Sequence, residues 1–215
     1  MRRRHFIALG AWPLAVGTCG AAAQAASPAK PPVILIVGDS ISAEYGLARG
    51  SGWVALLEQR LAREKLTAQV VNASISGDTT AGGRSRLAGL LERHKPAVVV
   101  LELGGNDALR GLPLETTRDN LTAMTRAAQA AGARVLLLSM QVPPNYGADY
   151  TRRFAAVFGD VAKAERAALV PFLLKGIADA RDPTAGFQSD RIHPNEAAQP
   201  TLLANVWPEL RKLLK

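Results

Sequence analysis

Short apolar runs alternate with longer stretches of helical periodicity from about residue 33 to the C-terminus. The run at residues 33–37 is continuous and β-branched, which is typical of a strand buried on both faces. The predicted strands span residues 33–37, 69–73, 97–103, 134–139 and 169–172. The predicted helices span residues 52–65, 83–94, 116–131, 150–168 and 195–214. This alternation predicts an α/β fold, with a parallel sheet covered by helices on both faces.

Length and composition agree with one globular domain. The chain has 215 residues, of which 48% are hydrophobic and 20% charged, and these values exclude disordered, collagen-like and coiled-coil proteins. A single cysteine excludes a disulfide scaffold and a multi-cysteine zinc site. The net charge of +8 is spread along the chain apart from one N-terminal basic run, so we expect no nucleic-acid partner.

The N-terminus has the three parts of a secretory signal peptide. Arg2–Arg4 form a basic head, Phe6–Val16 an apolar core, and Ala23–Ala25 a small-residue cleavage site. A core of about 11 residues is short of the ~20 needed to span a bilayer, which argues against a retained anchor. We therefore expect residues 1–25, with Cys19, to be removed, leaving residues 26–215 as one periplasmic or secreted domain with a net charge of about +5. The arginines also fit a twin-arginine signal, so the export route stays open.

Polar, glycine-containing segments follow the first three predicted strands. They read Gly38-Asp39-Ser40, Ser76-Gly77-Asp78 and Gly104-Gly105-Asn106-Asp107. Ligands of parallel α/β sheets bind at the carboxyl ends of the strands. We therefore expect a functional site at this edge of the sheet.

A serine, a histidine and an aspartate could form a hydrolytic triad there. Ser40 follows the first strand, and Asp190 and His193 lie three residues apart near the C-terminus. A serine nucleophile needs a base and a carboxylate that orients the base, and Asp-x-x-His can supply both. His5 falls in the signal and His94 ends a predicted helix, so His193 is the plausible base. Taken singly, Ser40 could be a helix cap or turn residue, and His193 a structural residue at a helix entry.

Gly77 and Asn106 are candidate donors for an oxyanion hole. A glycine N–H can approach a substrate closely, and an asparagine amide supplies another donor. The N–H of Ser40 would be a third. Either residue could also serve only as a turn residue.

These segments together resemble the four sequence blocks of the SGNH or GDSL hydrolases, and among them the bacterial periplasmic arylesterase, thioesterase I and lysophospholipase L1 group. The blocks are Gly38-Asp39-Ser40-Ile41, Asn72-Ala73-Ser74-Ile75-Ser76-Gly77-Asp78-Thr79, Leu103-Gly104-Gly105-Asn106-Asp107 and Asp190-Arg191-Ile192-His193-Pro194-Asn195. The resemblance implies a flavodoxin-like three-layer α/β/α fold with a five-stranded parallel sheet. It also implies Ser40 as nucleophile, His193 as base, Asp190 as its orienter, and Ser40, Gly77 and Asn106 as the oxyanion hole. Two residues depart from the family pattern, namely Ile41 in place of leucine and Arg191 where relatives commonly have glycine.

Other functions explain the residues less well. The segment Gly38–Ser42 lacks the second glycine of G-x-S-x-G, and Gly77–Gly83 lacks the lysine of a phosphate-binding loop. With one histidine at the site we expect no metal and no cofactor. A flavin-binding module would fit the fold but would leave Asp190 and His193 unexplained.

We expect the substrate to be a small-molecule or lipid ester or thioester. The loops Asp107–Pro113 and Val142–Asp149 are expected to form an acyl pocket, with side chains from Leu109, Leu112, Val142, Pro143 and Tyr146. A carbohydrate O-deacetylase is the alternative, but it would need aromatic platforms, and aromatic residues make up only 5% of the chain. We expect at most peripheral membrane contact, and the sequence makes no prediction of oligomeric state.

Overall fold

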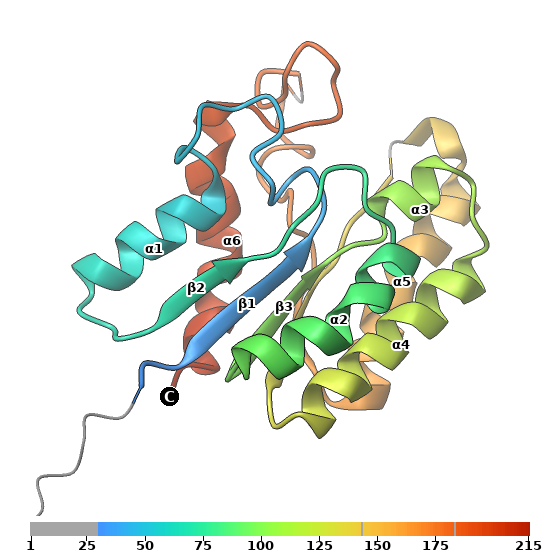
Figure 1. The fold of residues 1–215 in the computed structure, drawn as a ribbon. Coiled ribbons are helices and arrows are strands. Elements are labelled where there is room, and N and C mark those ends of the chain that lie inside the picture. Colours follow the sequence, from blue (N-terminus) through green and yellow to red (C-terminus); the bar gives the residue numbers. More distant parts are fainter. Residues whose placement is uncertain (1–29, 143, 183) are drawn as a thin grey trace, which may run out of the picture. The chain divides into compact units, whose positions relative to one another are not determined.

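Five parallel strands form a single sheet in the order β2-β1-β3-β4-β5 (Figure 1). The computed structural model describes residues 30–142, 144–182 and 184–215, so the predicted signal peptide lies outside the described residues. Within these, residues 31–215 form one compact unit. The strands are β1 (Val33–Gly38), β2 (Gln69–Asn72), β3 (Val98–Glu102), β4 (Arg134–Leu138) and β5 (Ala168–Val170).

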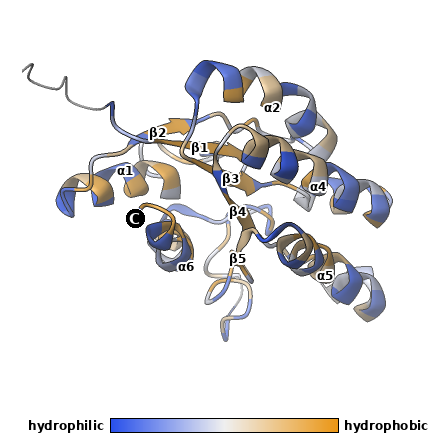
Figure 2. Ribbon diagram, turned by 90° about the horizontal axis from the view of Figure 1, so that it is seen from below, coloured by the Kyte–Doolittle hydropathy of each residue, from blue (hydrophilic) through white to orange (hydrophobic). Residues whose placement is uncertain are grey.

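Helices cover both faces of this sheet, which confirms the three-layer fold. Figure 2 shows α1 and α6 on one side, and α2, α4 and α5 on the other. The helices are α1 (Trp53–Arg63), α2 (Thr80–His94), α3 (Gly105–Leu109), α4 (Leu114–Ala130), α5 (Ala148–Glu165) and α6 (Gln199–Lys212). Single 3₁₀ turns span Pro144–Tyr146 and Glu196–Ala198. In the described part of the chain, the search for a helix long and apolar enough to cross a membrane finds none.

The core follows from the two periodicities of the sequence. All five residues of β3 are buried, because helices pack on both faces of this central strand. In α1, the buried residues Trp53, Val54, Leu57 and Leu61 recur every three to four positions and so form one stripe toward the sheet. Edge strand β2 is only partly buried.

Two differences from the predicted elements lie near the carboxyl edge. Residues 105–109 form α3, whereas the sequence predicted a loop there, because five residues are too few to show helical periodicity. Helix α2 begins at Thr80 and not at residue 83, since the side chain of Thr79 accepts a hydrogen bond from the Gly82 N–H at 3.3 Å. Glycine suits position 83 because a Cβ atom there would lie only 2.3 Å from Cδ1 of Leu103.

The strand order reverses between β1 and β3, where a ligand-binding crevice is expected in a parallel sheet. Strand β2 lies on one side of β1, while β3, β4 and β5 follow on the other. At such a reversal the loops after neighbouring strands diverge to opposite faces, and ligands bind between them. The segments after β1 and β3, which carry Ser40 and Asn106, meet at this point.

Candidate active site

A chain of two short hydrogen bonds links Ser40, His193 and Asp190. The Ser40 hydroxyl, in the turn that follows β1, lies 2.8 Å from Nε2 of His193. The Nδ1 atom of the same ring lies 2.6 Å from Oδ2 of Asp190. The structure thus brings together a hydroxyl and an imidazole 153 positions apart in the sequence. Ser40 is only 9% exposed, so the hydroxyl is held in the crevice and not on the open surface.

The loop before α6 positions the carboxylate and the imidazole as one unit. Oδ1 of Asp190 accepts the N–H groups of Ile192 and His193, which leaves Oδ2 for the ring. Burial raises the pKa of Asp190, but these hydrogen bonds outweigh it and lower the pKa to about 2. Since a carboxyl usually titrates near 3.9, this interaction stabilises the fold above that range and is lost as the pH falls toward 2.

The backbone of this loop also explains the departure at residue 191. Arg191 is exposed and has φ of 58°, in the left-handed region that favours glycine. The tight turn around it requires that conformation. In this turn the Arg191 N–H donates to the Gln188 carbonyl, while Asp190 before it and His193 after it are hydrogen-bonded to each other. The arginine is therefore held in a strained backbone conformation beside the site.

Replacing Arg191 by glycine is expected to raise the melting temperature. Relief of the left-handed strain stabilises the folded protein by about 1–2 kcal/mol. The greater flexibility of glycine in the unfolded chain cancels about half of this gain. A gain of up to about 1 kcal/mol corresponds to about 2–4 °C. Thermal unfolding measures it. Lys95→Gly, at the left-handed end of α2 where φ is 44°, is the matched control and should gain stability as well. A lower melting temperature in Arg191→Gly with a gain in Lys95→Gly would show that Arg191 makes a stabilising contact.

Three N–H donors are available around the Ser40 hydroxyl. Within the described part of the chain, the N–H groups of Ser40 and Gly77 form no hydrogen bond. Gly77 has φ of 78°, a conformation that glycine adopts without strain. The side-chain amide of Asn106 uses one hydrogen on Asp39, at 2.9 Å, and keeps the other. Preorganised donors of this kind stabilise an oxyanion.

Hydrogen bonds on both sides hold the segment that carries Gly77. The Ile75 N–H donates to the carbonyl of Gly38, at the end of β1. Arg110, at the end of α3, donates to the Gly77 carbonyl at 2.8 Å, which orients this peptide group. The segment with Gly77 is thus tied to the end of β1 and to the end of α3, the short helix that follows β3.

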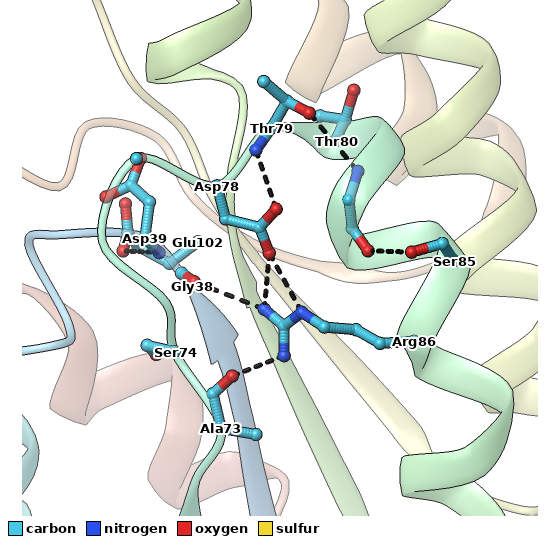
Figure 3. Close-up of polar contacts among 12 residues, drawn as sticks. Gly38, Asp39, Ala73, Ser74, Asp78, Thr79, Thr80, Ser85, Arg86 and Glu102 are labelled. Atoms are coloured by element: carbon cyan, nitrogen blue, oxygen red, sulfur yellow. Dashed lines mark hydrogen bonds and ion pairs between the residues drawn. The ribbon is translucent and has the colours of Figure 1, made fainter.

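Arg86 of α2 is hydrogen-bonded to the same β2–α2 loop (Figure 3). Its guanidinium binds the Asp78 carboxylate with distances of 2.8 and 2.9 Å and donates to the carbonyl of Ala73. A third contact, 3.5 Å long, reaches the carbonyl of Gly38. One cation therefore connects the β2–α2 loop with the end of β1. Arg86 could not be recognised from the sequence, because its partners lie 8, 13 and 48 positions away.

Asp39 was also missed as a functional residue, although it precedes Ser40. Its side chain is buried, and it accepts the Ile41 N–H at 3.1 Å and the Asn106 amide at 2.9 Å. Burial raises the pKa of Asp39 to about 6, against the lowering effect of these hydrogen bonds. Asp39 thus sets the direction of the Asn106 amide. Its place beside Ser40 was a signal in the sequence, but nothing there indicated Asn106 as its partner.

The residues expected to form the acyl pocket have different environments. Leu109 and Tyr146 are 39% and 37% exposed at the carboxyl edge, and Leu112 is half-buried. Val142 is buried and packs in the hydrophobic core. Pro143 lies outside the described residues. The loop predicted at residues 107–113 begins within α3.

Exposed large apolar side chains mark the rim of the crevice. Among the described residues there is one after each of the five strands, and they are Tyr45, Ile75, Leu109, Tyr146 and Ile192. Tyr45 also packs against the ring of His193, with 4.4 Å between the ring centroids. An apolar rim around a polar centre suits a ligand with a hydrocarbon part.

The described side chains offer no candidate metal centre: within residues 30–215, apart from 143 and 183, no group of three or more His, Cys, Asp or Glu could hold a metal ion. The site itself brings together a hydroxyl, an imidazole, a carboxylate and N–H groups. A serine, an imidazole and a carboxylate in series, beside free N–H donors at the carboxyl edge of a parallel sheet, are the arrangement of serine hydrolases.

Comparison with known proteins identifies the family. The model of the GDSL-like lipase/acylhydrolase family matches residues 36–199. Esterase TesA of Pseudomonas aeruginosa is 52% identical over 201 residues, 94% of this chain and 98% of that protein. Thioesterase 1/protease 1/lysophospholipase L1 of Escherichia coli K12 is 38% identical over 181 residues, 84% of each chain. A crystal structure of TesA matches with a TM-score of 0.81 and 55% identity, covering 84% of this chain and 99% of that one. The chain belongs to the GDSL-like lipase/acylhydrolase family, and the resemblance seen in its motifs is confirmed.

Proposed function

We propose that the protein hydrolyses acyl esters and thioesters through a covalent acyl-enzyme at Ser40. The observation that carries this proposal is the pair of hydrogen bonds from Ser40 through His193 to Asp190, of 2.8 and 2.6 Å. This series gives the hydroxyl a base within reach and gives the base an orienting carboxylate.

The geometry supports a two-step acyl transfer. In the first step, Nε2 of His193 takes the proton of Ser40 as Oγ attacks the carbonyl carbon of the substrate. The N–H groups of Ser40, Gly77 and Asn106 stabilise the oxyanion of the tetrahedral intermediate. The imidazolium then gives its proton to the leaving alcohol or thiol, and the acyl group stays on Ser40. In the second step, His193 activates a water molecule, which releases the carboxylic acid and restores the serine.

The electrostatics of the site favour this role for His193. The low pKa of Asp190, about 2, keeps its carboxylate ionised at any pH at which the enzyme would work. That carboxylate accepts a hydrogen bond from Nδ1 and stabilises the imidazolium that forms during the reaction. It also fixes the tautomer, so that Nε2 faces Ser40 without a hydrogen.

The rim of the crevice supports acyl chains as the substrate class. The five exposed apolar residues defined above surround the polar centre, and three of them are leucine or isoleucine. The names of the relatives, an esterase and a thioesterase/lysophospholipase, also point to ester and thioester substrates, lysophospholipids among them. A carbohydrate O-deacetylase has less support, because aromatic platforms for a sugar are few at this rim.

We further propose that residues 1–25 act as an export signal and that the domain works outside the cytoplasm. Their basic head, apolar core and small-residue site support this, and relatives match nearly the whole of the remaining chain.

A substrate panel together with active-site labelling tests the proposed function. We expect hydrolysis of p-nitrophenyl esters, acyl-CoA and lysophosphatidylcholine, and we expect phenylmethylsulfonyl fluoride to add one label, on the peptide that contains Ser40. Ser42, two positions away and only 1% exposed against 9% for Ser40, is the internal control and should remain unlabelled. Release of acetate from acetylated oligosaccharides, with no turnover of the other substrates, would instead identify an O-deacetylase.

A further inference from the structure

Glu102 is a fully buried acid that the proposed reaction does not use. It ends β3, where the other residues of the strand are valine and leucine, and its exposed fraction is 0%. Its backbone is paired with Gly38, the last residue of β1. An acidic side chain at the centre of a sheet costs free energy unless it is neutral or well paired, so its presence calls for a reason.

The carboxyl group of Glu102 is hydrogen-bonded to the turn that carries Ser40, both before and after this serine. Its Oε2 atom accepts the backbone N–H of Asp39 at 3.2 Å and the hydroxyl of Ser42 at 2.8 Å. The indole N–H of Trp53, at the start of α1, donates to the same Ser42 hydroxyl at 3.2 Å. These contacts connect β3, the turn that carries Ser40, and α1. The hydrogen bond from the Asp39 N–H to Glu102 is visible in Figure 3. The residues immediately before and shortly after Ser40 are therefore anchored to one atom.

Gly38 makes this contact sterically feasible. A Cβ atom at residue 38 would lie only 2.7 Å from Oε2 of Glu102 and 2.8 Å from the Ser42 hydroxyl oxygen. The carboxyl group thus occupies the space beside the glycine, at the point where the chain leaves β1. The N–H of Asp39 has no strand partner there, and Glu102 supplies its acceptor.

Asp39 is a second buried carboxyl close to Glu102, and the surroundings of the two groups determine which of them is ionised. Asp39 accepts two N–H hydrogen bonds, whereas Oε1 of Glu102 has no partner among the described residues. Burial and the charge of Asp39 raise the pKa of Glu102 well above its usual range. The other charged groups on this side favour ionisation of Asp39, since His193 attracts it, while Arg86 is already paired with Asp78.

We propose that Glu102 is a positioning residue of the esterase, which in its neutral form fixes the turn around Ser40 and leaves the single negative charge on Asp39. The proposal rests on the proposed role of Ser40 as nucleophile. Through the Asp39 N–H and the Ser42 hydroxyl, Glu102 holds Oγ of Ser40 in line with the imidazole. Because it carries no charge, Asp39 can stay ionised and hold the Asn106 amide toward the oxyanion.

Two substitutions of Glu102 separate its hydrogen bonds from its charge. Glu102→Gln keeps an acceptor at Oε2 and is always neutral, so kcat should stay within about threefold of wild type, with an unchanged pH profile. Glu102→Met has a similar volume but no acceptor for the Asp39 N–H or the Ser42 hydroxyl. We expect its kcat on p-nitrophenyl butyrate to fall about 10–100-fold with KM nearly unchanged, because small displacements of a nucleophile have effects of this size. The rate of labelling by phenylmethylsulfonyl fluoride should fall in parallel.

Controls distinguish positioning from a general loss of stability. Val99→Ala removes buried volume from the same strand and should lower the melting temperature without changing kcat. Should Glu102→Met fail to fold, Ser42→Ala decides, since it removes one of the two contacts and should lower kcat about 3–10-fold. Wild-type kcat in Glu102→Met, or in Ser42→Ala if that variant has to decide, would overturn the proposal. A Glu102→Gln variant as impaired as Glu102→Met would overturn the neutral role. Failure of the proposed function is separately visible, as full activity of Ser40→Ala.

Discussion

Ser40→Ala is expected to lower kcat for p-nitrophenyl butyrate by at least about 10⁴-fold, because it removes the atom that would form the acyl-enzyme. The remaining rate would come from the N–H donors and from substrate binding. The protein should stay folded, since the only side-chain hydrogen bond lost is the one to Nε2 of His193. One such bond is worth about 1 kcal/mol, or about 2–4 °C in melting temperature.

A second serine of the same β1–α1 connection provides the matched control. The Ser51 hydroxyl donates to the carbonyl of Ala48 and, among the described residues, forms no hydrogen bond with Ser40, His193 or Asp190, so Ser51→Ala should keep wild-type kcat. Steady-state kinetics and intact-protein mass after labelling would be measured on both variants. Turnover by Ser40→Ala at more than about a hundredth of the wild-type rate, with the same substrate preference, would mean that Ser40 is not the nucleophile.

Asp190→Asn is expected to lower kcat by about 10³–10⁴-fold at neutral pH, with little change in KM. Asparagine can still accept the N–H groups of Ile192 and His193 through its oxygen, so the loop should keep its shape. Its NH₂ group would then face Nδ1 of the imidazole and donate to it. The ring hydrogen would move to Nε2, where it prevents the imidazole from accepting the Ser40 proton. Asp179→Asn, an exposed aspartate of the loop after β5, is the control and should remain active.

The same hydrogen-bond chain determines the pH dependence of the wild-type enzyme. Because the pKa of Asp190 is about 2, the carboxylate stays ionised above about pH 3, and protonation of the imidazole at low pH removes the base. The value of kcat/KM should therefore rise with pH through the mildly acidic range and level off above neutrality. A constant kcat/KM from pH 5 to 9, with acylation limiting the rate, would exclude His193 as the base.

Local sequence determined the elements of the fold and most of the candidate site. The apolar run of β1 is continuous because that strand is covered on both faces, so its position could be predicted without knowledge of its neighbours. Ser40, Gly77 and Asn106 could be found because each directly follows a strand, and the carboxyl ends of parallel strands share one edge. Asp190 and His193 were found as a pair because both lie in one turn of the chain. Their roles stay predictions until the variants above are measured.

The tertiary structure alone decided which side chains became neighbours. Glu102 is an acid within an apolar run, and the sequence contains no sign that its carboxyl lies beside Gly38, more than 60 positions earlier. That contact exists because the strand order places β3 next to β1, whereas sequence periodicity reports only whether a position is buried. The same holds for the contact of Asp39 with Asn106. Hydrophobic patterning acts within a few residues along the chain, but packing selects partners across the whole sheet.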